Sequence, residues 1–192
     1  IGKIDKSINT SQYNKYLKSL KSLPTKLNIL INDFTPVAKK ISKKIALADA
    51  CYFIGRNITY PIALEGSLKL KEISYMHSEG FPGGEMKHGP IALIDKDTIT
   101  VCLIPKNDLF EKSVSNAQEI SARNGKIIIL SSVRNMSKIN GEIKVINMPK
   151  ENIIDTPFIY TIPLQLISYY FALYEGTDID QPRNLAKSVT VE

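Results

Sequence analysis

Three charged residues stand at helical spacing in the stretch LEGSLKLKEISY, namely Glu65, Lys69 and Glu72. With Glu65 at zero and about 100° per residue, Lys69 falls at about 40° and Glu72 at about −20°. The three charges therefore share one face of a helix predicted over residues 60–76. Apolar residues flank or oppose this face: Ile62, Ala63, Leu64, Leu68, Leu70, Ile73 and Tyr75. A helix that is apolar nearly all round is normally buried, so we expect the charged face at a cleft or an interface.

The chemistry open to this charged face depends on how far it is shielded from water. A glutamate beside a lysine in a partly dry site is a candidate base for a proton on a carbon next to a carbonyl group. Burial and neighbouring charges shift pKa values at such sites. The same spacing also fits a solvent-facing Glu–Lys ion pair, which contributes about 0.2–0.5 kcal/mol. Spacing alone leaves both interpretations open and names no substrate.

A histidine follows in a glycine-rich stretch, GGEMKHGP, at residues 83–90. The chain has two histidines, His77 and His88. A lone histidine is more often a surface or a core residue than a catalytic one. Glycines let the backbone come close to another group, however, which makes His88 a candidate functional residue.

Short apolar runs alternate with helical patterns from residue 50 onward. Strands are predicted at residues 50–54, 99–104, 127–130 and 143–146, with a short extra strand near 78–81, and helices at 60–76 and 108–123. This alternation predicts a doubly wound α/β fold with a parallel sheet. Ligands of such sheets bind beyond the carboxyl ends of the strands, so we expect the site in loops such as 55–59 and 131–132.

The first part of the chain has a different texture. Residues 9–48 carry no glycine and repeat apolar residues at helical spacing, which predicts two or three helices. Pro24 and Pro36 each stand where a helix could begin, with Thr35 as a cap before the second. The net charge of +6 belongs to this end, because residues 1–50 hold ten Lys and three Asp. These lysines lack arginine clusters and interleaved aromatics, so we expect a solvated helix face, not a nucleic-acid-binding surface.

Length and composition, 192 residues with 43% hydrophobic, fit one globular domain. Cys51 and Cys102 stand in apolar runs without metal-ligand spacing and are predicted to be reduced core residues. The start IGKIDKSINT has no apolar signal-peptide region, which favours a cytoplasmic protein, and its lack of Met indicates a piece of a longer chain. The most membrane-like stretch, residues 158–174, contains Pro163 and Gln165 and is predicted to be a buried helix.

Four motifs, in this order, resemble one known family. They are LEGSLKLKEISY (64–75), GGEMKHGPIALI (83–94), YTIPLQLISYY (160–170) and DQPRNLAKSVTVE (180–192). The sequence is similar to the glutamine:fructose-6-phosphate aminotransferases, or glucosamine-6-phosphate synthases, over the second sugar-isomerase (SIS) domain of their isomerase half. The resemblance implies a flavodoxin-like SIS fold with a parallel sheet of about five strands flanked by helices. It also implies a linker at residues 1–8, the second SIS domain at 9–175 and a tail at 176–192 that closes the active site.

The resemblance further implies an activity, the conversion of fructose-6-phosphate to glucosamine-6-phosphate, which is the first step of hexosamine synthesis. Glu72 is similar to the acid/base that moves a proton between C1 and C2 of the sugar. Lys69 is similar to its neighbour in that step, and Glu65 to the carboxylate that orients the lysine.

Other parts of the family's site lie on separate segments. His88 matches the residue that opens the sugar ring, which the neighbouring subunit of a homodimer contributes in the family. Lys187 matches a tail lysine that contacts the open sugar and can form a Schiff base, and Ala186 beside it matches a substrate-binding position. The resemblance implies neither a metal nor an organic cofactor.

The chain departs from the full family pattern in two respects. The family's glutaminase half begins with a nucleophilic cysteine, whereas the first cysteine here is Cys51, so we expect no glutamine hydrolysis by this chain. The family binds the sugar phosphate mainly through loops of the first SIS domain, and residues 131–135 here lack the glycine-containing helix start of a phosphate cradle. We therefore expect an incomplete fragment whose partners are the glutaminase and the first SIS domain.

The alternative interpretation is a non-catalytic SIS module that binds a phosphosugar as a regulator. Such a sensor needs no proton-shuttling carboxylate and lysine, so the charged helix and Lys187 favour the enzyme. A nucleic-acid-binding protein would show salt-dependent affinity, and the position of the charge disfavours it. Neither nucleic acid nor a membrane is an expected partner.

Overall fold

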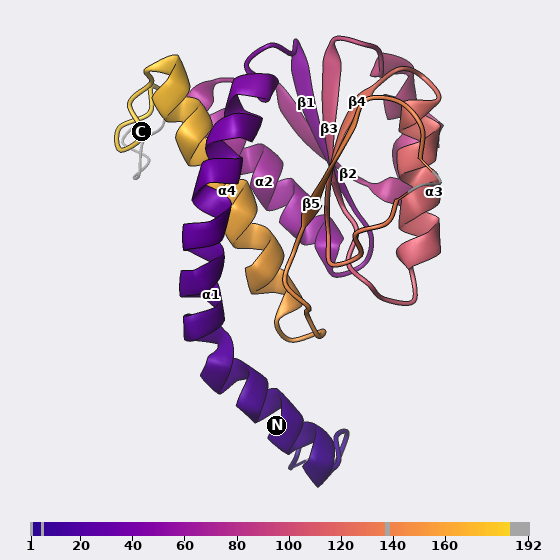
Figure 1. The fold of residues 1–192 in the computed structure, drawn as a ribbon, viewed down its shortest axis with the longest axis vertical. Helices are drawn as coiled ribbons and strands as arrows, with labels where there is room; N and C mark the ends of the chain where they lie inside the picture. The colour runs from indigo at the N-terminus through magenta and orange to yellow at the C-terminus, as the bar shows by residue number, and fades with distance from the viewer. Residues whose placement is uncertain (1, 5, 137–138, 185–192) are drawn as a thin grey trace, which may run out of the picture.

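The computed structural model describes residues 2–4, 6–136 and 139–184, and a sheet of five parallel strands forms its centre (Figure 1). The strands are β1 (Ala50–Gly55), β2 (Ser78–Pro82), β3 (Thr98–Leu103), β4 (Lys126–Ser131) and β5 (Ile143–Asn147), in the order β2-β1-β3-β4-β5. This order confirms the predicted flavodoxin-like, doubly wound fold, including the extra strand near residues 78–81. β1 and β3 are buried along their whole length, because helices cover both faces of the sheet.

The helices form two layers, one on each face of the sheet. One layer holds α1 (Thr10–Ile45), α2 (Thr59–Ser74) and α4 (Thr156–Glu175), and the other holds α3 (Phe110–Ser121) (Figure 1). Side chains alternate along a strand, so Cys51 and Phe53 pack under the first layer while Tyr52 and Ile54 pack under the second. Cys51 and Cys102 are free and buried, as predicted, and burial raises the pKa of both thiols.

The prediction of two or three helices in residues 9–48 is wrong, because α1 is one helix of 36 residues with Pro24 and Pro36 inside it. Thr35 is not a cap: its Oγ1 donates to the carbonyl oxygen of Ile31 at 2.8 Å. Both prolines are exposed, so water can reach the carbonyl groups that lose a helical partner. The buried residues of α1 are Ser19, Leu23, Leu30, Phe34, Ala38, Ile41, Ser42 and Ile45. Their packing along α4 and the sheet keeps the helix continuous across both prolines.

The lysines of α1 form a solvated face, as predicted. Those exposed are Lys15, Lys18, Lys21, Lys39, Lys40, Lys43 and Lys44. Lys26 differs, because its Nζ lies 2.6 Å from Oδ2 of Asp155, a fully buried carboxylate at the start of α4. Ser19 Oγ donates to the other oxygen of Asp155 at 2.6 Å. These two contacts tie the first half of α1 to α4.

The helix predicted over residues 158–174 is α4, but it is buried along one face only, since Phe158, Tyr169, Leu173 and Tyr174 are exposed. No helix in the described parts of the chain is long and apolar enough to cross a membrane. Helix α2 packs between α4 and β1 at Gly66, where an added Cβ would lie 2.5 Å from Cδ1 of Leu164 and 3.0 Å from Cδ1 of Phe53. α2 ends two residues earlier than predicted, because Tyr75 takes a left-handed φ of 62°.

We expect Gly66→Ala to lower the free energy of unfolding. Overpacking of a core contact costs about 1–3 kcal/mol, which outweighs the roughly 1 kcal/mol by which alanine favours a helix over glycine. Urea unfolding followed by circular dichroism measures the difference. Leu68→Ala, on the exposed side of the same helix, is the control and should lose less. A Gly66→Ala protein as stable as the wild type would show that α2 is not closely packed here.

Candidate active site

Lys69 and Glu72 form a direct ion pair on the charged face of α2. Nζ of Lys69 donates to Oε2 of Glu72 at 2.6 Å, and the two side chains are 35% and 27% exposed. Glu65, one turn earlier, is partly buried, and its charge acts on Lys69. No hydrogen bond to Oε1 of Glu72 occurs within the described residues. The face therefore has a fixed ammonium group beside a carboxylate with one oxygen open to another partner.

The pKa of Lys69 is raised above its usual value. The hydrogen bond to Glu72 is the largest cause, and the charges of Glu72 and Glu65 act in the same direction, while burial opposes them. Lys69 is therefore a cation at neutral pH and is not a free amine able to attack a carbonyl group. Its chemical capacity is to orient Glu72 and to stabilise negative charge on a neighbouring oxygen.

A groove of about 410 Å³ lies beside Lys69, between α1, α2 and α4. Lys69 and Ile73 line it from α2, Leu166 and Tyr169 from α4, and Ile179 from the segment that follows α4. Most of the lining is apolar, so the ammonium group of Lys69 stands beside an apolar surface.

Within the described residues, the loop after β1, predicted as a ligand site, lines a much smaller cavity. The strand order reverses between β1 and β3, which is where ligands bind in related sheets. Here Nε of Arg56 donates to Oδ1 of Asn116 at 2.8 Å across the carboxyl ends of these strands. The remaining cavity measures about 10 Å³, enough for about one water molecule. The switch point is thus filled by the chain's own side chains.

The second predicted loop, after β4, is also bonded internally. Ser131 Oγ accepts a hydrogen bond from the backbone N–H of Val133 at 3.1 Å, and Ser132 Oγ donates to Oε1 of Glu151 at 3.0 Å. Both hydroxyl groups therefore have partners within their own domain.

His88 ends a short 3-10 helix, Gly83–His88, and is exposed. No hydrogen bond or ion pair joins it to Lys69 or Glu72 within the described residues, so the structure of one chain does not bring these predicted site residues together. The loop is seated on Arg56, because an added Cβ at Gly84 would lie 3.0 Å from Nη2 of Arg56. Ala186 and Lys187 lie outside the described residues.

Two features near the site were missed by the reasoning from sequence. Arg56 closes the switch point with Asn116, which is 60 residues away. Tyr75 contacts Arg183, at a separation of 108 residues. Arginine after a strand and tyrosine at a helix end are too common to indicate such partners. No group of three or more His, Cys, Asp or Glu within the described residues is placed to hold a metal ion.

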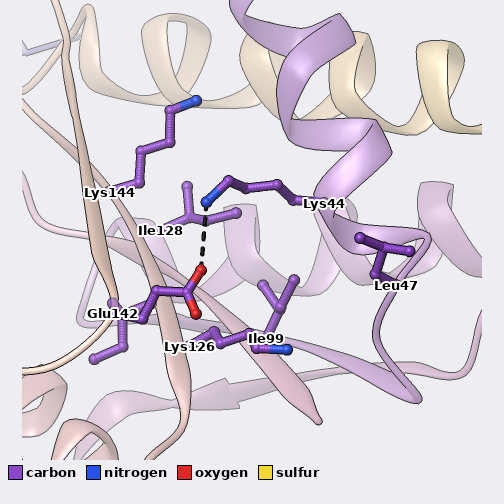
Figure 2. A pocket seen from close by; sticks show the side chains of 8 residues that line it. Lys44, Leu47, Ile99, Lys126, Ile128, Glu142 and Lys144 are labelled. Carbon is purple, nitrogen blue, oxygen red and sulfur yellow. Dashed lines mark hydrogen bonds and ion pairs between the residues drawn. The ribbon is translucent and has the colours of Figure 1, made fainter. Parts of the chain in front are cut away.

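A second pocket, of about 250 Å³, lies at the amino edge of the sheet, away from the charged face of α2 (Figure 2). Lys44, Lys126 and Lys144 line it around one carboxylate, Glu142. Lys44 pairs with Glu142 at 3.4 Å, and both side chains are well exposed. Burial, then the charges of Lys44 and Lys40, lower the pKa of Lys144. This pocket is basic, but water screens its single ion pair.

Comparison with known proteins shows the family to which the chain belongs. A profile of the SIS domain family matches residues 44–174. The glutamine–fructose-6-phosphate aminotransferase (isomerizing) of Haemophilus influenzae is 44% identical over 192 residues, which are 100% of this chain and 31% of that protein. The enzyme of the same name from Pseudomonas syringae pv. tomato is 47% identical over 196 residues, with the same coverage. The C-terminal domain of glucosamine-fructose-6-phosphate aminotransferase from Francisella tularensis has a TM-score of 0.87 at 38% identity, covering 93% of this chain and 50% of that one.

The parallel sheet and the profile match define the class of protein: the chain belongs to the SIS domain family. Within that family it is similar to the isomerizing glutamine–fructose-6-phosphate aminotransferases, and it spans 31% of the length of the Haemophilus relative.

We expect the side chain of Lys69 to titrate above its usual pKa of 10.5. Because the folded-state pKa is raised, the Lys69–Glu72 bond is fully present below the usual value and is lost as pH rises through the raised one. Carbon NMR of labelled lysine side chains measures the midpoint, with circular dichroism to confirm folding at each pH. Glu72→Gln should lower the midpoint more than Glu65→Gln, since it removes both a charge and the charged bond. A midpoint at or below 10.5 would contradict the pairing.

Proposed function

We propose that this chain is the second SIS domain of an isomerizing glutamine:fructose-6-phosphate aminotransferase and that it acts in converting fructose-6-phosphate to glucosamine-6-phosphate. The observation that carries the proposal is the Lys69–Glu72 ion pair, whose lysine lines an apolar groove. The similarity to enzymes of that name over the full chain supports it.

The proposed chemistry is a proton transfer between neighbouring carbons of the open-chain sugar. Glu72, through the oxygen that Lys69 does not hold, takes a proton from one carbon and returns it to the other. Lys69 stays protonated, orients Glu72 and stabilises the negative charge that develops on the sugar oxygen, while Glu65 supports the charge of Lys69. Lys187 contacts the open sugar, with Ala186 beside it.

Other parts of the reaction are assigned to the rest of the assembly. The chain spans about a third of its curated relatives, so ammonia from glutamine and most of the phosphate binding are attributed to the glutaminase and the first SIS domain. The small cavity at the switch point between β1 and β3 supports this division, since among the described residues it has room for about one water molecule. His88 acts from the neighbouring subunit of a homodimer. A cytoplasmic location stays a prediction.

The alternative, a non-catalytic module that binds a phosphosugar, makes a different demand on α2. A sensor needs contacts to hydroxyl and phosphate groups, but it needs no ammonium-oriented carboxylate beside an apolar groove. We therefore favour the enzyme, and the response of isomerisation to loss of the Glu72 carboxylate separates the two.

We expect Glu72→Gln in the full-length enzyme to abolish isomerisation while glutamine hydrolysis continues. The amide keeps the shape of the side chain and loses its basicity, and a general base contributes about 10²–10⁴-fold to the rate. Glucosamine-6-phosphate formation and glutamate release are measured in the same preparation. Glu142→Gln, the same change at the amino edge of the sheet, is the matched control. Isomerisation at the wild-type rate in Glu72→Gln would show that the Lys69–Glu72 pair has a structural role only.

We expect a His88→Ala subunit and a Glu72→Gln subunit to complement each other when mixed. If each site takes His88 from one subunit and Glu72 from the other, a two-fold symmetric heterodimer has one intact site and one doubly altered site. Activity should therefore appear on mixing two inactive proteins, up to about a quarter of wild type when half of the dimers are mixed. Native mass spectrometry verifies subunit exchange. Exchange without recovered activity would place both residues of a site in one subunit.

A further inference from the structure

The turn after β1 holds the backbone of Arg56 in a fixed position at the carboxyl end of the sheet. The N–H of Arg56 donates to Oγ1 of Thr59 at 2.9 Å, and the same hydroxyl group donates to the carbonyl oxygen of Arg56, also at 2.9 Å. Thr59 is buried at the start of α2. Gly55 permits the turn, because an added Cβ there would collide with the carbonyl oxygen of Thr59. The side chain of Arg56 therefore starts from a backbone with little freedom.

The guanidinium group of Arg56 joins this turn to α3. Its Nε donates to Oδ1 of Asn116 at 2.8 Å, and Asn116 is buried on α3. Arg56, Gly83 and Asn116 also line the cavity of about 10 Å³ at the switch point. Packing this close leaves side chains little room to move. The Arg56–Asn116 pair is thus a defined surface built from two elements that are distant in sequence.

The start of the loop at residues 83–90, the His88 loop, packs against this pair. An added Cβ at Gly83 would lie 2.8 Å from Oδ1 of Asn116, and one at Gly84 would lie 3.0 Å from Nη2 of Arg56. Two glycines in succession therefore let the backbone approach both members of the pair. Met86 follows and is fully buried, in the same core layer as Ile54 and Ile91. The first half of the loop is fixed by the pair and by the core.

His88 lies on the exposed part of the loop that these contacts hold. Lys87, His88 and Gly89 are exposed, between the buried side chains of Met86 and Ile91. Gly89 has a φ of 140°, which side chains rarely permit, and this angle turns the chain into the next short helix, Pro90–Leu93. The direction in which His88 projects from the domain therefore depends on how the loop packs on the Arg56–Asn116 pair.

We propose that the Arg56–Asn116 pair positions His88 for the site of the neighbouring subunit. This inference rests on the proposed function, and it makes Arg56 and Asn116 positioning residues without contact to the reacting atoms. Without the pair, the glycines lose the surface against which they pack, and the His88 loop samples more positions. A catalytic group displaced by about 1 Å can cost about 10²-fold in rate.

The first test follows the loop without catalysis, by hydrogen–deuterium exchange of the full-length protein. Arg56→Met keeps the length of the side chain without the guanidinium group, and Asn116→Leu removes the acceptor. In both variants we expect the peptide covering residues 83–90 to exchange at least about tenfold faster than in wild type, with a peptide from α4 unchanged. Asn116→Asp, which keeps an acceptor oxygen, should stay near wild type. Wild-type exchange of the loop in both Arg56→Met and Asn116→Leu would overturn the proposal.

The second test measures the consequence for the reaction in the same proteins. In Arg56→Met and Asn116→Leu we expect kcat/KM for isomerisation to fall about tenfold or more, with glutamine hydrolysis unchanged. Arg123→Met, the same change at an exposed arginine just after α3, is the matched control. Wild-type isomerisation in both variants would overturn the positioning role. So would a loss in Arg56→Met alone, because it would indicate a direct contact between the guanidinium group and the substrate.

The third test assigns Arg56 to one half of the shared site by mixing subunits. Arg56 serves the His88 of its own subunit, so a dimer of one Arg56→Met and one Glu72→Gln subunit has one site with both groups intact. On mixing equal amounts, isomerisation should rise at least about fivefold above the average of the two unmixed proteins. Mixing Arg56→Met with His88→Ala should give no rise, because both changes affect the same half of the site.

The pattern of recovery separates this proposal from the proposed function. Recovery with His88→Ala, or with neither partner once native mass spectrometry shows subunit exchange, would overturn the role of Arg56 in positioning His88. The mixture of His88→Ala with Glu72→Gln, run alongside, tests the shared site itself. No recovery in that mixture would overturn the shared site and the role of Arg56 in it, whereas hydrogen–deuterium exchange reports separately whether the pair holds the loop.

Discussion

The close approach of α2 to its neighbours is the constraint on which the rest of the site depends. Gly66 lets the helix lie against Phe53 of the sheet and Leu164 of α4 at once, because no side chain intervenes. Because the Gly66 face of α2 is fixed in this way, the helical repeat determines where its other side chains point. Lys69 and Ile73 then line the groove, and their position relative to the sheet is set by packing, which tolerates little change in volume.

The same packing decides how the charges of α2 behave. Lys69 is partly shielded from water, which by itself lowers the pKa of an ammonium group, yet the hydrogen bond that Lys69 donates to Glu72 and the charges of Glu72 and Glu65 raise it. The cation is therefore retained, and the carboxylate beside it is held in one orientation. A pair in open solvent would contribute little and would sample many geometries. Partial burial therefore restricts the geometry of the Lys69–Glu72 pair more than open solvent would.

The ends of α2 join the site to two other parts of the chain. At its start, Thr59 bonds the backbone of Arg56, whose side chain fills the switch point and supports the loop that leads to His88. At its end, Thr177 and Arg183 hold the returning chain. One helix thus organises segments that the sequence keeps far apart. In the described part of the chain, the switch point where related folds bind ligands holds the Arg56–Asn116 hydrogen bond and a cavity of about 10 Å³.

Sequence alone determined the strands, their parallel arrangement and the face shared by Glu65, Lys69 and Glu72, because these depend on local periodicity. It also placed both cysteines in the core, since apolar runs are buried when helices cover both faces of a sheet. Sequence alone failed for α1, because Pro24 and Pro36 indicated helix ends where the helix continues. Whether an exposed proline ends a helix depends on the packing of the opposite face against α4, which no local sequence pattern shows.

The contacts at the switch point, and those that hold Thr177 and Arg183 to α2 and Tyr75, were likewise decided only by tertiary structure. Arg56 with Asn116 and Tyr75 with Arg183 are pairs of common residues far apart in the chain, and nothing in either residue's neighbourhood names its partner. The role of each is set by the geometry that brings strands and helix ends together. Local spacing can therefore predict that charged residues share one face of a helix. The cavity beside that face, and its contacts with distant residues, form only when the chain folds.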